Sequence, residues 1–169
     1  MDVRLEQLSE EHLDGIDALT LDPAVLRFTR IPDPPPDGFA RTWLARYEQG
    51  RVDGSREAFA IVDGAGGFLG VALAPHIDRT GGELELGYVV APAARGRGIA
   101  SEALRLLTQW AFAELGARRI VLYISVENEA SQRVAARCGY VREGVLRSLY
   151  IKPGVREDTE LWSRLSTDS

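Results

Sequence analysis

The stretch that decides the fold of this chain leads out of an apolar strand, through a loop with two glycines, and into an amphipathic helix. It reads Tyr88-Val89-Val90-Ala91-Pro92-Ala93-Ala94-Arg95-Gly96-Arg97-Gly98-Ile99-Ala100-Ser101-Glu102. Gly96 and Gly98 come just before the helix start, where the absence of a Cβ lets the backbone approach a ligand closely. A helix N-terminus presents unpaired N–H groups and a partial positive charge, and two arginines add mobile positive charge beside it. The stretch therefore predicts an anion site, most naturally for phosphate.

Two well-known phosphate loops can be compared with this stretch by their spacing. A Walker loop ends in Gly-Lys-Ser/Thr, and no such sequence follows Gly98. A Rossmann loop is followed by an acidic residue about 20 positions further on, whereas this chain is basic at Arg118 and Arg119. Spacing therefore favours neither loop, and a glycine-rich helix start without a ligand stays open as an alternative.

The composition is that of a globular protein. The chain has 169 residues, of which 45% are hydrophobic and 27% are charged, so we treat residues 1–169 as one domain. The net charge of −5 argues against general nucleic-acid binding. We find no membrane-span or signal-peptide pattern, one cysteine (Cys138), and two histidines (His12 and His76) that are too isolated to predict a metal site. We therefore expect a cytoplasmic protein with no metal, membrane or nucleic-acid partner.

The N-terminal part of the chain predicts one strand followed by helices. Alternating polarity indicates a strand over Asp2–Gln7, and Ser9 is a good N-cap for the helix after it. A second short helix is expected at Val25–Phe28. The proline-rich segment Ile31–Gly38 cannot be a regular helix or a central strand, so we expect a loop within the domain. Aromatic residues every four positions predict a further helix over Asp37–Gln49.

The middle of the chain predicts three strands. Glu57–Val62 and Phe68–Ala74 flank a glycine-rich turn and predict an antiparallel hairpin. Pro75–Gly82 reads as a polar connection to a third strand over Glu83–Val90. Gly87 lies inside that strand, which indicates a bulge or a close backbone approach.

The C-terminal part predicts a crossover and a closing hairpin. Apolar residues at helical spacing predict a helix over Ile99–Leu115, followed by a buried strand over Ile120–Val126. A strand, helix and strand in this order form a crossover with parallel strands. A short helix then ends before Gly139, and two last strands are expected over Tyr140–Leu149 and Arg156–Leu165.

Two segments resemble the GNAT superfamily of acetyl-CoA-dependent N-acetyltransferases. Arg95–Ala100 is similar to the pyrophosphate motif of that family, Arg/Gln-x-x-Gly-x-Gly/Ala. Asn128–Gly144 and the Gly87-Tyr88 pair are similar to the RimJ/RimL branch, the ribosomal-protein alanine N-acetyltransferases. The order of the expected elements is also similar over nearly the whole chain. The resemblance implies an α/β fold with a mostly antiparallel, mixed sheet of six to seven strands, one parallel crossover and about four flanking helices.

By this resemblance the cosubstrate would be acetyl-CoA. Amides of the glycine loop would hold the pyrophosphate, and the end of the third strand would pair with the pantetheine arm. An asparagine amide, which can donate and accept at once, would contact the pantetheine or the thioester region. The cofactor-binding residues predicted in this way are Val89, Val90, Arg95, Gly96, Arg97, Gly98, Ile99, Ala100 and Asn128.

Acetyl transfer to an amine needs a neutral amine, a stabilised oxyanion and a proton for the leaving thiolate. Glu85 lies where the family often has a base, although a solvent-facing strand residue would look the same in sequence. Many relatives have a tyrosine acid seven residues after the asparagine, but this chain has Ala135 there. Ser131 is the substitute proposed for the RimL-like branch and is also a good helix-start cap. Tyr88 and Tyr150 are further donors, or the thiolate leaves to water unaided.

Three functions remain open at this point. The chain is an N-acetyltransferase acting on a primary amine (a protein N-terminus or a small-molecule amine), an acetyl-CoA-binding module without efficient turnover, or another nucleotide-binding domain. The acceptor depends on the loop Thr29–Gly38, on the final hairpin at Tyr150–Gly154, and on Phe39, Trp43 and Tyr47. These aromatic residues either pack on the core or line an acceptor pocket. An exposed strand edge beside the final hairpin would allow a homodimer.

Overall fold

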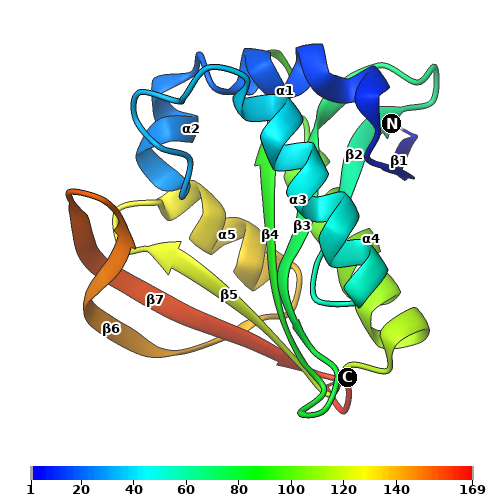
Figure 1. Ribbon diagram of the computed structural model, residues 1–169. Helices are drawn as coiled ribbons and strands as arrows, with labels where there is room; N and C mark the ends of the chain where they lie inside the picture. Colours follow the sequence, from blue (N-terminus) through cyan, green and yellow to red (C-terminus); the bar gives the residue numbers. More distant parts are fainter. Residues whose placement is uncertain (1, 169) are drawn as a thin grey trace.

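The computed structural model describes residues 2–168 and contains within them seven strands and five α-helices (Figure 1). The strands are β1 (Val3–Gln7), β2 (Glu57–Asp63), β3 (Phe68–Asp78), β4 (Glu83–Val90), β5 (Arg119–Ser125), β6 (Val141–Lys152) and β7 (Val155–Leu165). The helices are α1 (Leu13–Leu19), α2 (Pro23–Phe28), α3 (Phe39–Asp53), α4 (Ile99–Leu115) and α5 (Glu129–Arg137). Short 3₁₀ helices precede α1 and follow β4, at Glu10–His12 and Pro92–Ala94.

All seven strands form one sheet in the order β1-β2-β3-β4-β5-β7-β6. Neighbouring strands are antiparallel except β4 and β5, which run parallel because α4 connects them as a crossover. The predicted mixed sheet is therefore confirmed, with five flanking helices where about four were expected. Among residues 2–168, no helix is long and apolar enough to cross a membrane.

Helix α4 forms the main core on one face of the sheet. Leu104, Leu107 and Ala111 are fully buried there, one to two turns apart on the same side of the helix. Each buried leucine contributes about 1.5–3 kcal/mol to folding. Gly116, with a φ of 63°, ends the helix in the left-handed conformation that favours glycine. The helix predicted over Ile99–Leu115 is therefore confirmed at both ends.

The aromatic residues of α3 belong to a second core on the opposite face of the sheet, which also contains buried residues of α1. Tyr47 is 5% exposed, and its ring meets that of Trp43 edge to face with 4.7 Å between centroids. Phe39 and Trp43 are partly buried against the same cluster. Burial raises the pKa of Tyr47 to about 12. Of the two interpretations offered by the sequence, the structure supports packing on the core.

Strand β3 is longer than expected, and the polar connection predicted over Pro75–Gly82 is wrong in its first half. The strand continues past Ala74, and Pro75 lies where the register with β4 shifts between Leu73 and His76. A bulge leaves a residue unpaired, so a proline without an N–H is accommodated at this point in the sheet. The bulge that Gly87 indicated for β4 therefore lies in the neighbouring strand β3, next to Leu73, which pairs with Gly87.

Candidate active site

The two parallel strands diverge after a short paired segment. Glu83–Glu85 pairs with Arg119–Val121, and the register between β4 and β5 includes no later pair among residues 2–168. Strand β4 nevertheless continues to Val90 and β5 to Ser125, and Figure 1 shows the two strands separating beyond the paired segment. The edge of β4 that faces β5 therefore presents backbone groups without a strand partner, which another extended chain can pair with.

The glycine loop lies at the start of α4, next to this edge. Gly96 and Gly98 have φ values of 73° and 79°, and a Cβ built on either residue would meet no atom within 4 Å. The N-cap residue is Gly98, which has no side chain that could accept from the N–H groups of the first turn. Ile99 is 2% exposed and anchors the helix start in the core. Loop and helix together form the local structure of an anion site.

Arg95 differs from the mobile cation that the sequence suggested. Its Nε donates to the carbonyl of Val90 at 3.2 Å, and its Nη1 lies 3.1 Å from Oδ2 of Asp22. The other carboxylate oxygen of Asp22 accepts from the amides of Ala24 and Val25, at 2.8 and 3.0 Å, and so caps α2. Burial raises the pKa of Asp22, but the hydrogen bonds from the Val25 amide and from Arg95 outweigh it, and the net pKa lies below the usual value. Arg95 thus joins the loop to helix α2.

The carboxylate of Glu85 is held by an arginine from the loop Thr29–Gly38. Arg30 Nη1 lies 2.7 Å from Glu85 Oε1, and the glutamate side chain is only 17% exposed. Alternation along β4 puts Glu85 on the face that also carries Gly87 and Val89. Glu85 is therefore a largely covered, ion-paired residue and not a solvent-facing one.

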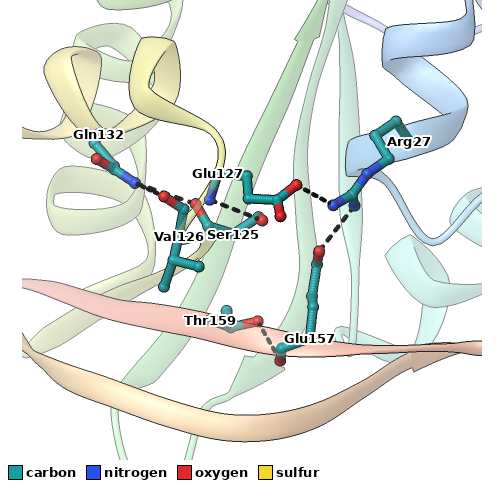
Figure 2. Close-up of polar contacts among 7 residues, drawn as sticks. All are labelled: Arg27, Ser125, Val126, Glu127, Gln132, Glu157 and Thr159. Atoms are coloured by element: carbon teal, nitrogen blue, oxygen red, sulfur yellow. Dashed lines mark hydrogen bonds and ion pairs between the residues drawn. The ribbon is translucent and has the colours of Figure 1, made fainter.

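Arg27 joins α2 to strand β7 and to the segment after β5 (Figure 2). Arg27 lies 2.6 Å from the carboxylate of Glu127, after β5, and 2.8 Å from that of Glu157 in β7. Gln132 of α5 donates to the carbonyl of Ser125 at 3.2 Å, which fixes the start of α5 against the end of β5. These contacts hold α2, β7 and the β5–α5 connection around one end of the diverging strands.

Lys152 completes the attachment of α2. The residue is 7% exposed, and its Nζ donates to the carbonyls of Leu26 and Ile31 at 2.5 and 2.7 Å. Burial is the main reason why the pKa of Lys152 is lowered. Sequence reasoning missed Lys152 together with Arg27 and Arg30, because a lysine in a turn and arginines near prolines resemble solvated surface residues. Their partners lie far away along the chain.

The residues expected at the start of α5 are Asn128 and Ser131. Asn128 caps the helix, since its Oδ1 accepts from the backbone N–H of Ser131 at 3.2 Å. The capping role that the sequence allowed for Ser131 thus belongs to Asn128. Ala135, one turn later, is fully buried and carries no polar group.

The structure places the predicted residues on three elements, of which α4 contacts the other two. Glu85, Val89 and Val90 lie on β4, the glycine loop begins α4, and Asn128 and Ser131 begin α5. Helix α4 contacts both β4 and α5. The arrangement combines a glycine-capped helix N-terminus, a strand edge without a strand partner and a carboxylate on the neighbouring strand face. A helix N-terminus of this kind can bind an anion, and the strand edge can pair with an extended chain.

Comparison with known proteins agrees with this geometry. Residues 2–141 match the model of the acetyltransferase (GNAT) domain. The chain belongs to the GNAT acetyltransferase family. YdaF of Bacillus subtilis strain 168, an N-acetyltransferase by name, is 33% identical over 113 residues, which are 66% of this chain and 60% of YdaF. The matches span between 45% and 60% of the length of the first three curated relatives.

Two solved GNAT structures share the whole fold. RimL, the ribosomal L7/L12 alpha-N-protein acetyltransferase in complex with coenzyme A, superposes with a TM-score of 0.89 at 20% identity, covering 100% of this chain and 97% of RimL. Spermidine N-acetyltransferase from Vibrio cholerae, in complex with CoA and spermine, superposes with a TM-score of 0.86 at 20% identity, covering 99% and 97%. The expected GNAT fold is thus confirmed. The RimJ/RimL-like branch is supported by sequence relatives, YdaF and the ribosomal-protein-serine acetyltransferase of Escherichia coli strain K12, which is 32% identical over 98 residues.

Proposed function

We propose that this chain is an acetyl-CoA-dependent N-acetyltransferase that moves an acetyl group to a primary amine by direct attack in a ternary complex. The observation that carries the proposal is the uncapped start of α4 beside the unpaired edge of β4. The first can bind an anion and the second can pair with an extended chain, which match the pyrophosphate and the adjoining pantetheine arm of CoA. Relatives that bind CoA with the same fold support the assignment.

In this proposal the cofactor follows β4 from the loop to the acetyl group. Backbone amides of Arg95–Ala100 bind the pyrophosphate, and the backbone of Val89 and Val90 pairs with the pantetheine arm. The Oδ1 of Asn128 is used as the helix cap, so its amide nitrogen is the part that contacts the pantetheine or the thioester region. Arg95 contributes through its backbone and holds the loop through its side chain.

The chemistry needs no covalent enzyme intermediate. Glu85 takes a proton from the amine, the nitrogen attacks the thioester carbonyl, and the C–S bond breaks with its electron pair on sulfur. Arg30 must release the Glu85 carboxylate, or share it, when the amine arrives. Ser131 donates to the leaving sulfur. A general base contributes typically 10²–10⁴-fold, so we expect Glu85→Gln to lower turnover by at least about 100-fold.

The acceptor is a primary amine, either a protein N-terminus or a small-molecule amine. Both classes occur among the relatives, as RimL and the spermidine enzyme show. The carboxylates of Glu85, Glu127 and Glu157 around the site favour a cationic acceptor, although Arg27 and Arg30 compensate part of that charge. The missing tyrosine at Ala135 favours the second candidate, an acetyl-CoA-binding module without efficient turnover.

Calorimetric titration with acetyl-CoA tests the assignment first, with CoA, NAD and ATP as comparisons. We expect micromolar binding of the CoA species alone, and its loss in Gly98→Glu. Binding of NAD or ATP instead would contradict the proposal. An amine screen then separates the two candidates, because only an enzyme releases CoA faster when an acceptor is added. An unchanged rate in Glu85→Gln would remove Glu85 from the mechanism.

A further inference from the structure

The hydroxyl of Tyr88 is a buried polar atom without a hydrogen-bond partner among residues 2–168. Buried hydroxyls are normally paired, and an unpaired one destabilises the folded protein. The buried tyrosine Tyr140 follows the rule, since its hydroxyl lies 2.7 Å from Oγ1 of Thr108. The exception at Tyr88 therefore calls for a physical reason.

Tyr88 lies two residues before Val90, on the face of β4 that packs against the core formed with α4 and α5. Burial raises the pKa of Tyr88 to about 12. Ser131 of α5 is the polar side chain that opposes this rise in the pKa, although the two hydroxyl groups do not meet the geometry of a hydrogen bond. The neighbouring Cys138 is engaged elsewhere, because its Sγ donates to the carbonyl of Ser101 at 3.4 Å.

We infer that Tyr88 is a positioning residue that orients the hydroxyl of Ser131 toward the leaving sulfur of acetyl-CoA. The inference rests on the proposed acetyltransferase function. Once the thioester is bound, Tyr88 Oη donates to Ser131 Oγ, and the proton of Ser131 then points outward at the sulfur. The phenol supplied by strand β4 thus compensates for the lack of a side-chain donor at Ala135 of α5.

The step transfers no proton from Tyr88. The new N–C bond forms, the C–S bond breaks, and the electron pair remains on sulfur. Ser131 donates a hydrogen bond to the developing thiolate, which later takes its proton from water, as a thiol of pKa about 8.5 allows. The amine proton leaves through Glu85. Tyr88 stays neutral throughout, and its raised pKa keeps it a donor at every working pH.

The variant Tyr88→Phe tests the inference, with Tyr140→Phe as the matched control. Removing an unpaired hydroxyl leaves the melting temperature unchanged or raises it, while kcat falls about 5- to 20-fold and KM for acetyl-CoA stays constant. Tyr140→Phe removes a hydroxyl that is paired with Thr108, so it lowers the melting temperature and leaves kcat unchanged. A merely structural Tyr88 would give no kcat change, which would overturn the inference while wild-type turnover still supported the proposed function.

A double-mutant cycle with Ser131→Ala shows whether Tyr88 acts through Ser131. If it does, adding Tyr88→Phe to Ser131→Ala produces no further loss of kcat. Losses that multiply would show that the two hydroxyls act independently and would overturn the positioning role. If the wild-type protein releases no CoA with any amine, the proposed function fails, and this inference fails with it.

Discussion

Arg30 places its Nη1 2.7 Å from Oε1 of Glu85, so an arginine from the loop Thr29–Gly38 holds the carboxylate proposed as the base. The contact joins residues 55 positions apart in the chain. The guanidinium is half exposed, whereas the carboxylate is largely covered. In the proposed reaction, an incoming cationic amine would compete with Arg30 for the same oxygen atoms.

Arg30→Gln is expected to raise kcat/KM for the amine about two- to fivefold. A partly exposed ion pair is worth about 0.2–1 kcal/mol, and removing it frees the carboxylate by that amount. Arg41→Gln is the matched control. Arg41 lies on α3, and its Nη1 forms an exposed ion pair with Oε1 of Glu10 at 3.0 Å, which the substitution breaks. Steady-state kinetics with a saturating acetyl-CoA concentration measure the change. A fall in kcat/KM would mean that Arg30 orients the base.

Asp22→Asn is expected to tighten acetyl-CoA binding about two- to fivefold at low salt. Asparagine caps α2 as well as aspartate does, but it leaves the charge of Arg95 uncompensated beside the proposed pyrophosphate site. Calorimetry at two salt concentrations should show the gain shrinking as salt screens the charge. Asp22→Ala also loses the cap and should lower the free energy of unfolding by about 1 kcal/mol. Weaker binding by Asp22→Asn would show that anchoring of Arg95 matters more than its charge.

The contribution of Glu143 to the free energy of unfolding depends on pH in the acidic range. Hydrogen bonds from Arg119, at 2.5 and 2.9 Å, and from Ser163 lower the pKa of Glu143 from 4.5 to about 2. Because the folded pKa is depressed, this contribution is fully present above pH 4.5 and is lost as pH falls toward 2. Urea unfolding should show Glu143→Gln less stable by about 1 kcal/mol at pH 7, a value discounted for the 37% exposure of the side chain.

The difference between wild type and Glu143→Gln should shrink steadily between pH 4.5 and pH 3. Glu129→Gln serves as the control, since its ion pair with Arg133 is longer, at 3.4 Å, and more exposed. A pH-independent difference for Glu143→Gln would assign its effect to packing instead of charge.

Gly70→Ala should lower the stability of the fold, whereas Gly87→Ala should leave the stability nearly unchanged. A Cβ on Gly70 would lie 2.1 Å from the carbonyl oxygen of Val89, so the backbone of β4 must shift, and we expect a loss of about 3 kcal/mol in unfolding free energy. A Cβ on Gly87 meets nothing within 4 Å, so its stability should change by less than about 0.5 kcal/mol.

Gly87→Ala should nevertheless lower turnover about tenfold, because the new methyl group occupies the face of β4 that carries Glu85. Thermal melting and acetyl transfer, measured on the same preparations, distinguish the two effects. Full activity in Gly87→Ala would place the reaction elsewhere than on this face.

Several elements could be predicted because their signals are local. Helix α4 runs over Ile99–Leu115 as the apolar spacing indicated, and Gly116 ends it. The parallel pairing of β4 with β5 followed from the crossover between them. The roles of the glycine loop, Glu85, Asn128 and Ser131 came from a family resemblance, and they stay predictions until the variants are measured.

The sequence by itself determined the periodic helices and strands, the glycine loop and the family, because these depend on residues within a few positions of one another. Only the tertiary structure decided which charges meet. Arg27 reaches Glu157 across 130 positions, and Arg95 reaches Asp22 across 73. It also decided that β3 accommodates Pro75 at a bulge and that Tyr88 keeps a buried, unpaired hydroxyl. Such features depend on how the sheet and helices pack together, and this packing cannot be predicted from the local periodicity of the sequence.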